Sequence, residues 1–333
     1  MQADTLTLAG RYYDGTAAIF RGIAGLPGLH LQVKEETSVP KMFTGFFRGD
    51  YDASEMSLAE LVFYLTRDRN DFIAIPVFPS RVFRHSFLFC NAAAAIDGPE
   101  SLSGRKIAFQ RWVQTAGVWM RGMLVDEYGV SPTQTEWYVS SLHHWREEDG
   151  AVAPRDGSSI RWLGKGDEPQ ETEDAYRAVL EGRVDVMGVT EGQIAHLEQD
   201  SRVRRLFPEY VQAEADYYRK TQIFPIMHVI AIRREVVDRH PELPVDLFQL
   251  FANSKRLARA HVHSTPTMTL AWKDSYLDRE AAVFGGDAWP FGLAANQHTL
   301  EKFLEYCYQQ GIAARAAAPR DLFAPDTWDL GER

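Results

Sequence analysis

Strand-like and helix-like segments alternate along most of this chain, and this alternation limits the folds it can adopt. The strand-like runs of the first ninety residues lie at 6–10, 29–34, 51–57 and 72–78. The stretches with helical spacing of apolar residues lie between them, at 16–25, 39–49 and 58–68. A β-α-β-α-β-α-β order predicts a parallel, doubly wound sheet with helices on its faces.

The same order begins again after residue 90. A strand is predicted at 102–110, an amphipathic helix at 112–130 and a strand at 135–139, followed by a polar, Gly- and Pro-rich surface excursion at 140–171. A helix, a turn and a strand are predicted within 171–189, and a long strand at 225–234. The remainder is predicted to be mostly helical.

These patterns predict two α/β lobes joined by two crossings, which is the plan of a type II periplasmic-binding-protein fold. We expect lobe I to comprise residues 1–100 and 228–333, with the helical C-terminus, and lobe II to comprise residues 101–227. Each lobe is predicted to hold a doubly wound, mostly parallel sheet. Because ligands of open α/β sheets bind beyond the carboxyl ends of the strands, we expect a ligand cleft between the lobes.

Composition excludes some classes of partner. The 333 residues carry a formal net charge of −10, whereas surfaces that bind phosphate are basic, so nucleic acid is not expected. No stretch approaches the ~20 apolar residues of a membrane span, and the first residues lack the pattern of an export signal, so we expect a cytoplasmic protein with no membrane partner. Cys90 and Cys307 are expected to be reduced structural thiols.

A basic cluster interrupts the apolar run at 72–89. Its polar members are Arg81, Arg84, His85 and Ser86. A guanidinium that leaves water costs several kcal/mol unless a carboxylate, a phosphate or a set of hydrogen bonds replaces its hydration. The cluster therefore predicts an anionic partner, which is either a bound ligand or a protein carboxylate among Asp50, Asp52 and Glu55.

Five long segments carry more specific motifs. They are DYDASEMSLAELVFY (50–64), AIPVFPSRVFRHSFLF (74–89), TAGVWMRGMLVDEYGV (115–130), FPIMHVIAIRREVVDRHPEL (224–243) and WPFGLAANQHTLEKFLEYCYQQGI (289–312). These segments resemble the 4,5-dihydroxyphthalate decarboxylase family, and the resemblance covers nearly the whole chain. It implies a carboxy-lyase that converts 4,5-dihydroxyphthalate to protocatechuate without an organic cofactor, on a binding-protein scaffold. The departures from the family pattern lie at 140–171 and 188–193, so they concern the substrate more than the reaction class.

A hydroxylated phthalate carries two carboxylates, so its site needs cations. The arginine guanidinium can bind a carboxylate through two parallel hydrogen bonds. We expect Arg81 and Arg84 to have this role, together with Arg11 at the end of the first predicted strand. Arg121 is a further candidate, although an arginine in the middle of a helix is more often a solvated surface residue.

Decarboxylation of an arene requires a proton at the ring carbon that bears the departing carboxylate. Because imidazole titrates near neutrality, we expect His85 and His228 to be the proton-transfer pair. Glu55 is expected to act as an acid or to orient a histidine. The alternative for His228 is a hydrogen-bonded core histidine, and the alternative for Glu55 is an acid that stabilises a helix N-terminus.

Further polar residues are expected to contact the substrate. Ser57 can cap the helix that follows it or donate to a carboxylate at that helix N-terminus, and Ser86 belongs to the basic cluster. Trp112, Gln114 and Thr115 open the second-lobe helix and are suited to stack on an aromatic ring and to donate hydrogen bonds to it. The alternative for Trp112 is a core tryptophan.

No metal site is expected from the remaining histidines. His143 and His144 lie in the polar excursion, and His261 and His263 are spaced so that a helix points their rings in different directions. A divalent ion at His85, His228 and Glu55 is left open.

Two functions follow from these residues. The leading hypothesis is a cofactor-independent decarboxylase of a dihydroxylated aromatic dicarboxylate, with a small aromatic carboxylate as its partner. The alternative is a non-catalytic binding protein for an aromatic carboxylate or a similar small anion. The aromatic side chains of the C-terminal helices, Trp272 among them, are compatible with a homo-oligomer or with packing of the lobe.

Overall fold

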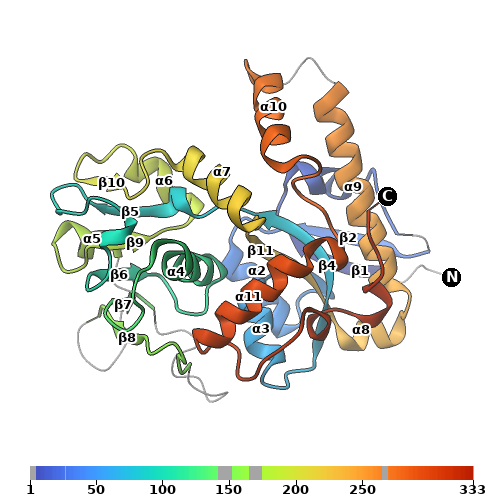
Figure 1. Ribbon diagram of the computed structural model, residues 1–333. Helices are drawn as coiled ribbons and strands as arrows, with labels where there is room; N and C mark the ends of the chain where they lie inside the picture. Colours follow the sequence, from blue (N-terminus) through green and yellow to red (C-terminus); the bar gives the residue numbers. More distant parts are fainter. Residues whose placement is uncertain (1–4, 27, 142–151, 165–174, 265–268, 333) are drawn as a thin grey trace. The chain divides into compact units, whose positions relative to one another are not determined.

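The computed structural model describes residues 5–26, 28–141, 152–164, 175–264 and 269–332. The chain divides into two compact units (Figure 1). Unit 1 comprises Met1–Arg81, Ile226–Glu301 and Ala318–Arg333, and unit 2 comprises Val82–Pro225 and Lys302–Ala317. Among the described residues, no helix is long and apolar enough to cross a membrane.

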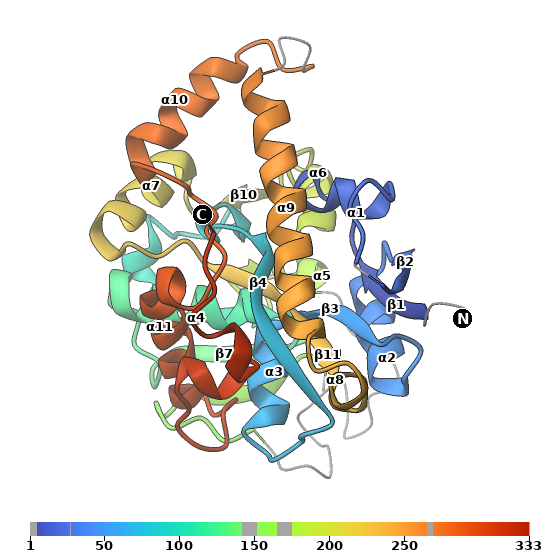
Figure 2. The ribbon, with the colours of Figure 1, turned by 90° about the vertical axis from the view of Figure 1, so that its right-hand side faces the viewer.

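Unit 1 is built on a five-stranded mixed sheet with the order β2-β1-β3-β11-β4 (Figure 2). Its strands are β1 (Thr5–Gly10), β2 (His30–Glu35), β3 (Ala53–Ser57), β4 (Phe72–Arg81) and β11 (Ile226–Arg233). β1 pairs in parallel with β2 and β3, whereas β11 is antiparallel to both β3 and β4. Every residue of β3 is buried, which places this strand at the centre of the core.

Helices surround the sheet of unit 1. They are α1 (Ala17–Phe20), α2 (Val39–Arg48), α3 (Leu58–Leu65), α8 (Arg234–Arg239), α9 (Leu243–Ser264) and α10 (Lys273–Phe284), with 3-10 turns η1 (Asp14–Thr16), η4 (Ala294–Asn296), η5 (Pro319–Leu322) and η6 (Pro325–Thr327). α2 ends at Gly49, which adopts the left-handed conformation that glycine tolerates best. α11 (Gln297–Gln309) begins in unit 1 and continues into unit 2.

Unit 2 is built on a six-stranded mixed sheet with the order β10-β5-β9-β6-β7-β8. Its strands are β5 (Leu88–Asn91), β6 (Lys106–Phe109), β7 (Glu136–Val139), β8 (Ser159–Trp162), β9 (Val186–Gly188) and β10 (Val203–Arg205). Its helical elements are η2 (His85–Phe87), η3 (Pro99–Ser101), α4 (Thr115–Tyr128), α5 (Ala175–Leu180), α6 (Glu191–Leu197) and α7 (Tyr210–Thr221). The helix predicted at 112–130 is α4, but the predicted amphipathic pattern is wrong, because all of Thr115–Leu124 is buried.

The α/β two-lobed architecture is as predicted, but the predicted boundaries differ from those of the structure. Residues 82–100 belong to unit 2 because β5 pairs with β9 and β10 of its sheet. Residues 302–317 also belong to unit 2, where Phe303 and Tyr306 pack on Trp119 of α4. Both sheets are mixed, because β11 and β5 run against their neighbours.

Candidate active site

Four strand ends of unit 1 meet at one edge of its sheet. β1, β3 and β4 run in one direction and β11 in the other, so the start of β11 lies beside the ends of the other three strands. In this register His228 of β11 lies opposite Ser57 of β3 on one side and Ser80 of β4 on the other. After β1 the chain passes to β2 on the side away from β3, and such points of divergence are where α/β sheets bind ligands.

Glu55 and His228 form a hydrogen-bonded pair at this edge. His228 Nδ1 lies 2.5 Å from Glu55 Oε1; the Glu55 side chain is 1% exposed and the His228 side chain 16%. Glu55 Oε1 also accepts the Tyr13 hydroxyl at 2.8 Å, and Oε2 accepts the backbone N–H of Arg11 at 3.1 Å. The Tyr13 hydroxyl and the Arg11 N–H both donate to this carboxylate, which acts as an acceptor. The imidazole therefore donates to it as well, through a proton on Nδ1. His228 Nε2 is then the nitrogen left to meet a substrate.

Two aromatic residues complete this arrangement. Burial and the neighbouring Glu55 carboxylate raise the pKa of Tyr13 well above its ordinary value, so the phenol remains a donor to that carboxylate. Phe43 of α2 meets the His228 ring edge-on, with the ring centroids 5.6 Å apart, and limits its rotation. Sequence reasoning missed Tyr13; the only signal was its position two residues after Arg11, just beyond a strand end.

Arg11 places a cation near Tyr13, which donates to Glu55. The guanidinium lies 5.6 Å from the centroid of the Tyr13 ring, and the side chain is partly exposed. Within the described parts of the chain, no carboxylate lies within ion-pair distance of this guanidinium. The predicted contact of Arg11 with a substrate carboxylate stays a prediction.

Arg81 has partners within unit 1 that are not carboxylates. Its Nη2 donates to the carbonyl of Pro290 at 3.0 Å and to Oδ1 of Asn296. Asn296 in turn donates to the carbonyls of Pro290 and Gly292. The buried Arg81 guanidinium thus fastens the turn at 290–296, and the expectation of an ion pair with Asp50, Asp52 or Glu55 is wrong for this arginine.

Arg84 and Ser86 lie in unit 2. The buried Arg84 guanidinium is 3.3 Å from the exposed Glu191 carboxylate. Burial lowers the pKa of Arg84, and the charges of Glu191 and Glu214 oppose that shift. Ser86 donates its backbone N–H to Glu214 at 3.1 Å. Burial raises the pKa of Glu214. Arg84 thus has acidic partners in the protein, but they are not the three carboxylates that the sequence suggested.

His85 is a fully buried histidine of unit 2. Phe207, Tyr217 and Tyr128 surround its ring, with centroids 5.0, 5.2 and 6.0 Å away. Neither ring nitrogen has a hydrogen-bond partner among the described residues, and burial lowers the pKa of His85 to about 4. Such an imidazole is neutral at pH 7, and these contacts favour a packing role for His85 over proton transfer. The structure assigns His85 and the Glu55–His228 pair to different units.

Ser57 caps a helix. Its hydroxyl accepts the backbone N–H of Glu60 at 3.4 Å, which places Ser57 at the N-cap of α3. The capping interpretation is therefore confirmed, and the substrate contact stays a prediction.

The predicted residues of the second-lobe helix also lie in unit 2. Trp112 is buried, its Nε1–H donates to the carbonyl of Gln310 at 2.9 Å, and the Arg121 guanidinium covers its ring at 3.8 Å. These contacts favour the alternative of a core tryptophan. Gln114 precedes α4 as its N-cap and the buried Thr115 is its first residue, and their contact with a substrate stays a prediction.

Arg121 is not a solvated surface residue. It is buried, and it donates from Nε to Gln310 Oε1 and from Nη2 to the carbonyl of Trp112, both at 2.8 Å. Burial lowers the pKa of Arg121 to about 9. Both of its hydrogen-bonded partners are neutral groups of unit 2.

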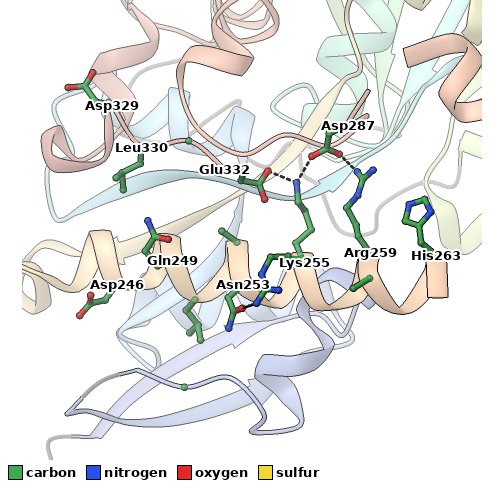
Figure 3. A pocket seen from close by; sticks show the side chains of 16 residues that line it. Asp246, Gln249, Asn253, Lys255, Arg259, His263, Asp287, Asp329, Leu330 and Glu332 are labelled. Atoms are coloured by element: carbon green, nitrogen blue, oxygen red, sulfur yellow. Dashed lines mark hydrogen bonds and ion pairs between the residues drawn. The ribbon is translucent and has the colours of Figure 1, made fainter. Parts of the chain in front are cut away.

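A hollow of unit 1, about 1150 Å³ in volume, runs along α9 and the last residues of the chain (Figure 3). Lys255 of α9 donates to Asp287 at 2.9 Å and to Glu332, and Arg259 pairs with Asp287. Glu332 also accepts the N–H of Phe291 at 2.7 Å. The charged groups shown joined in Figure 3 therefore pair with one another and hold the C-terminal segment against α9. None of the predicted site residues lines this hollow.

Metal ligands can be assessed only among the described residues. Within the described ranges, no three His, Cys, Asp or Glu side chains gather as a metal-ligand group. His143 and His144 lie outside the described residues.

Comparison with known proteins supports the resemblance drawn from the motifs. No protein-family model matches the chain. It is 29% identical to 4,5-dihydroxyphthalate decarboxylase of Comamonas testosteroni over 327 residues, which cover 96% of both chains. A 95-residue match at 33% identity to 4,5-dihydroxyphthalate decarboxylase of Pseudomonas putida covers 28% of this chain and 37% of that protein. The chain resembles 4,5-dihydroxyphthalate decarboxylases.

Solved structures with a similar fold include binding proteins. The periplasmic aliphatic sulphonate binding protein SsuA of Escherichia coli matches with a TM-score of 0.55 at 12% identity, over 98% of this chain and 99% of that one. The zinc-bound ligand-binding component of an ABC-type import system of Staphylococcus aureus matches with a TM-score of 0.54 at 12% identity, over 99% of both chains. At these identities the likeness establishes the periplasmic-binding-protein-like fold alone.

Proposed function

We propose that this chain is a carboxy-lyase that releases CO₂ from a dihydroxylated aromatic dicarboxylate, with 4,5-dihydroxyphthalate as substrate and protocatechuate as product. The resemblance to proteins named for that reaction supports the substrate and the product. The observation that carries the chemistry is the Glu55–His228 hydrogen bond, which leaves Nε2 of a partly exposed imidazole available beside Arg11.

Substrate binding and proton transfer are assigned to different residues. Arg11 binds the carboxylate that remains on the ring, because a guanidinium matches the geometry of a carboxylate. Protonated His228 delivers the Nε2 proton to the ring carbon that bears the other carboxylate. Glu55 holds the ring of His228 in place and stabilises its charged form through Nδ1.

The electron balance of this step needs no organic cofactor. The phenol para to the departing carboxylate loses its proton to water, and this moves electron density to the ring carbon that accepts the proton from His228. The bond between that carbon and the carboxylate then breaks, CO₂ leaves, and the electron pair of the bond restores the aromatic ring. The phenolate and His228 each regain a proton from water, so the net reaction consumes one proton for each CO₂ released.

A second function has its own support. Two solved structures with a similar fold are binding proteins, and Arg11 would serve equally well in a non-catalytic receptor for an aromatic carboxylate. Binding is common to both functions, whereas turnover belongs to one of them.

The test is to incubate the chain with 4,5-dihydroxyphthalate while following CO₂ release and ring absorbance, and to measure binding by calorimetry. We expect CO₂ release from the native chain and a loss of about 10²- to 10⁴-fold in His228→Gln, the usual contribution of a general acid. His240→Gln is the matched control, since His240 is a partly exposed histidine of unit 1 that lies 3.8 Å from Glu242. Binding without CO₂ release would establish the receptor instead, and the absence of both would refute this substrate.

A further inference from the structure

β4 carries a large bulge beside His228. Ile230 of β11 lies opposite Ile75 of β4, and His228 lies opposite Ser80, with a register shift between the two pairs. Two steps along β11 thus correspond to five steps along β4, so β4 contains three extra residues here. In a regular ladder the apolar Val77 would lie opposite His228. The bulge places the polar Ser80 there instead, and bulges next to active sites re-aim side chains in this way.

Two prolines and two contacts with a later turn hold the bulge in place. Pro76 and Pro79 have no N–H to donate to a ladder, and proline inside a sheet is confined to edges, first residues and bulges. The carbonyl of Pro76 accepts the N–H of Gly292 at 2.8 Å, and the carbonyl of Phe78 accepts the Nε1–H of Trp289 at 2.6 Å. The bulged backbone is therefore part of the packing of unit 1, and the strand end that follows it has a defined position.

Ser80 belongs to the hydrogen-bonded group around Glu55. Directly opposite residues of an antiparallel pair have their side chains on the same face, so Ser80 and His228 share a face of the sheet. A side-chain hydrogen bond joins Ser80 to Tyr13, and it opposes the rise in the pKa of that phenol that burial and Glu55 cause. The single O–H of Tyr13 is donated to Glu55, so Ser80 is the donor in its bond with Tyr13.

The Ser80 oxygen can accept a hydrogen bond while its own O–H is donated. A hydroxyl has one hydrogen and two lone pairs, so donation to Tyr13 leaves its acceptor positions in use for other partners. Both Ser80 and His228 are partly exposed. A ligand that reaches Nε2 of His228 therefore also meets, one strand away, an oxygen to which it can donate a hydrogen bond.

We propose that Ser80 binds the substrate and favours a hydroxylated ring, because its oxygen accepts a hydrogen bond from a ring hydroxyl. This assignment rests on the proposed function and adds a specificity residue to it. The hydroxyl concerned is the one meta to the departing carboxylate, since an acceptor holds the proton on its donor and the para hydroxyl has to lose its proton. An ionised carboxylate has no proton to donate to this oxygen, so the contact distinguishes ring hydroxyls from the carboxylates assigned to Arg11.

Calorimetric binding of 4,5-dihydroxyphthalate and of phthalate, which has no hydroxyl, tests this proposal. The full chain with His228→Gln serves as the background, so that the ligand is bound without being consumed. We expect the addition of Ser80→Ala to weaken binding of 4,5-dihydroxyphthalate about three- to tenfold, the usual effect of one neutral hydrogen bond, and to leave phthalate binding within about twofold. Ser80→Thr keeps the hydroxyl and should keep the preference. Ser275→Ala, at an exposed serine of α10, is the matched control and should change neither affinity.

The ratio of the two dissociation constants distinguishes recognition of the hydroxyl from packing. Equal weakening of both ligands by Ser80→Ala, or an unchanged preference for the hydroxylated ligand, would overturn the proposal. CO₂ release by the native chain decides the proposed function separately. A Ser80-dependent preference without CO₂ release would keep this assignment in a binding protein, whereas a chain that binds neither ligand would overturn both.

Discussion

Replacing Glu55 with glutamine tests the proposed active site most directly. The change keeps the size of the side chain and removes the charge that meets His228 Nδ1 at 2.5 Å. A hydrogen bond to a charged group contributes about 1.5–3 kcal/mol. If that bond holds the His228 ring in the position from which Nε2 transfers its proton, its loss corresponds to a fall of about 10- to 150-fold in kcat, at 1.36 kcal/mol per factor of ten.

The companion change Tyr13→Phe removes a neutral donor from the same oxygen. Such a bond contributes about 0.5–1.5 kcal/mol, so we expect a fall in kcat of only about two- to tenfold. In both variants KM for 4,5-dihydroxyphthalate should change little, because neither side chain is assigned to bind the substrate.

Initial rates of CO₂ release, with far-UV circular dichroism as a control for folding, measure these effects. The double variant Glu55→Gln/His228→Gln should be no slower than His228→Gln alone, because Glu55 acts through His228. A folded Glu55→Gln variant with native kcat, or losses that simply add in the double variant, would refute the reasoning.

Two further predictions concern buried charges. Burial lowers the pKa of His85 to about 4, so the unfolded chain takes up a proton before the folded one as pH falls below 6.5. The free energy of unfolding should therefore fall by about 3 kcal/mol between pH 6.5 and 4. His85→Phe should remove this pH dependence in urea titrations at pH 7 and pH 5, and should retain turnover if His85 is a packing residue. Lys255→Met should lower the free energy of unfolding by about 2–4 kcal/mol, because Asp287 and Glu332 lose their shared cation, and Lys255→Met/Glu332→Gln should cost less than the sum of the single changes.

The fold was predictable where local patterns decide it. The strand predicted at 6–10 is β1 (Thr5–Gly10), and the helix predicted at 39–49 is α2 (Val39–Arg48), because apolar spacing and a terminal glycine mark these elements locally. The strand predicted at 225–234 is β11 (Ile226–Arg233), but its antiparallel insertion between β3 and β4 depends on contacts about 150 residues away or more in the chain. Strand direction and unit boundaries follow from such pairings, which spacing along the chain does not record.

The candidate site was predictable only in part. Glu55, His228 and Arg11 were each singled out, and the structure brings them to one sheet edge. The cluster at 81–86 suggested one shared site, but its residues lie on both sides of a unit boundary. Arg81 belongs to unit 1 and His85 to unit 2. The partners of Arg81, at Pro290 and Asn296, are more than 200 residues away, so no local pattern could identify them.

The role of an arginine is decided by the partners it already has. Arg81 and Arg121 are buried and donate to neutral oxygens of the protein, and Arg84 is buried beside Glu191. An anion that displaced one of these protein partners would leave a buried group unpaired, which costs about 1–3 kcal/mol or more. Arg11 is partly exposed and, among the described residues, pairs with no carboxylate, so it can bind an anion without that loss. The same desolvation argument that made the buried arginines attractive in the sequence therefore selects Arg11 in the structure, near His228, whose ring is held by the buried Glu55 carboxylate.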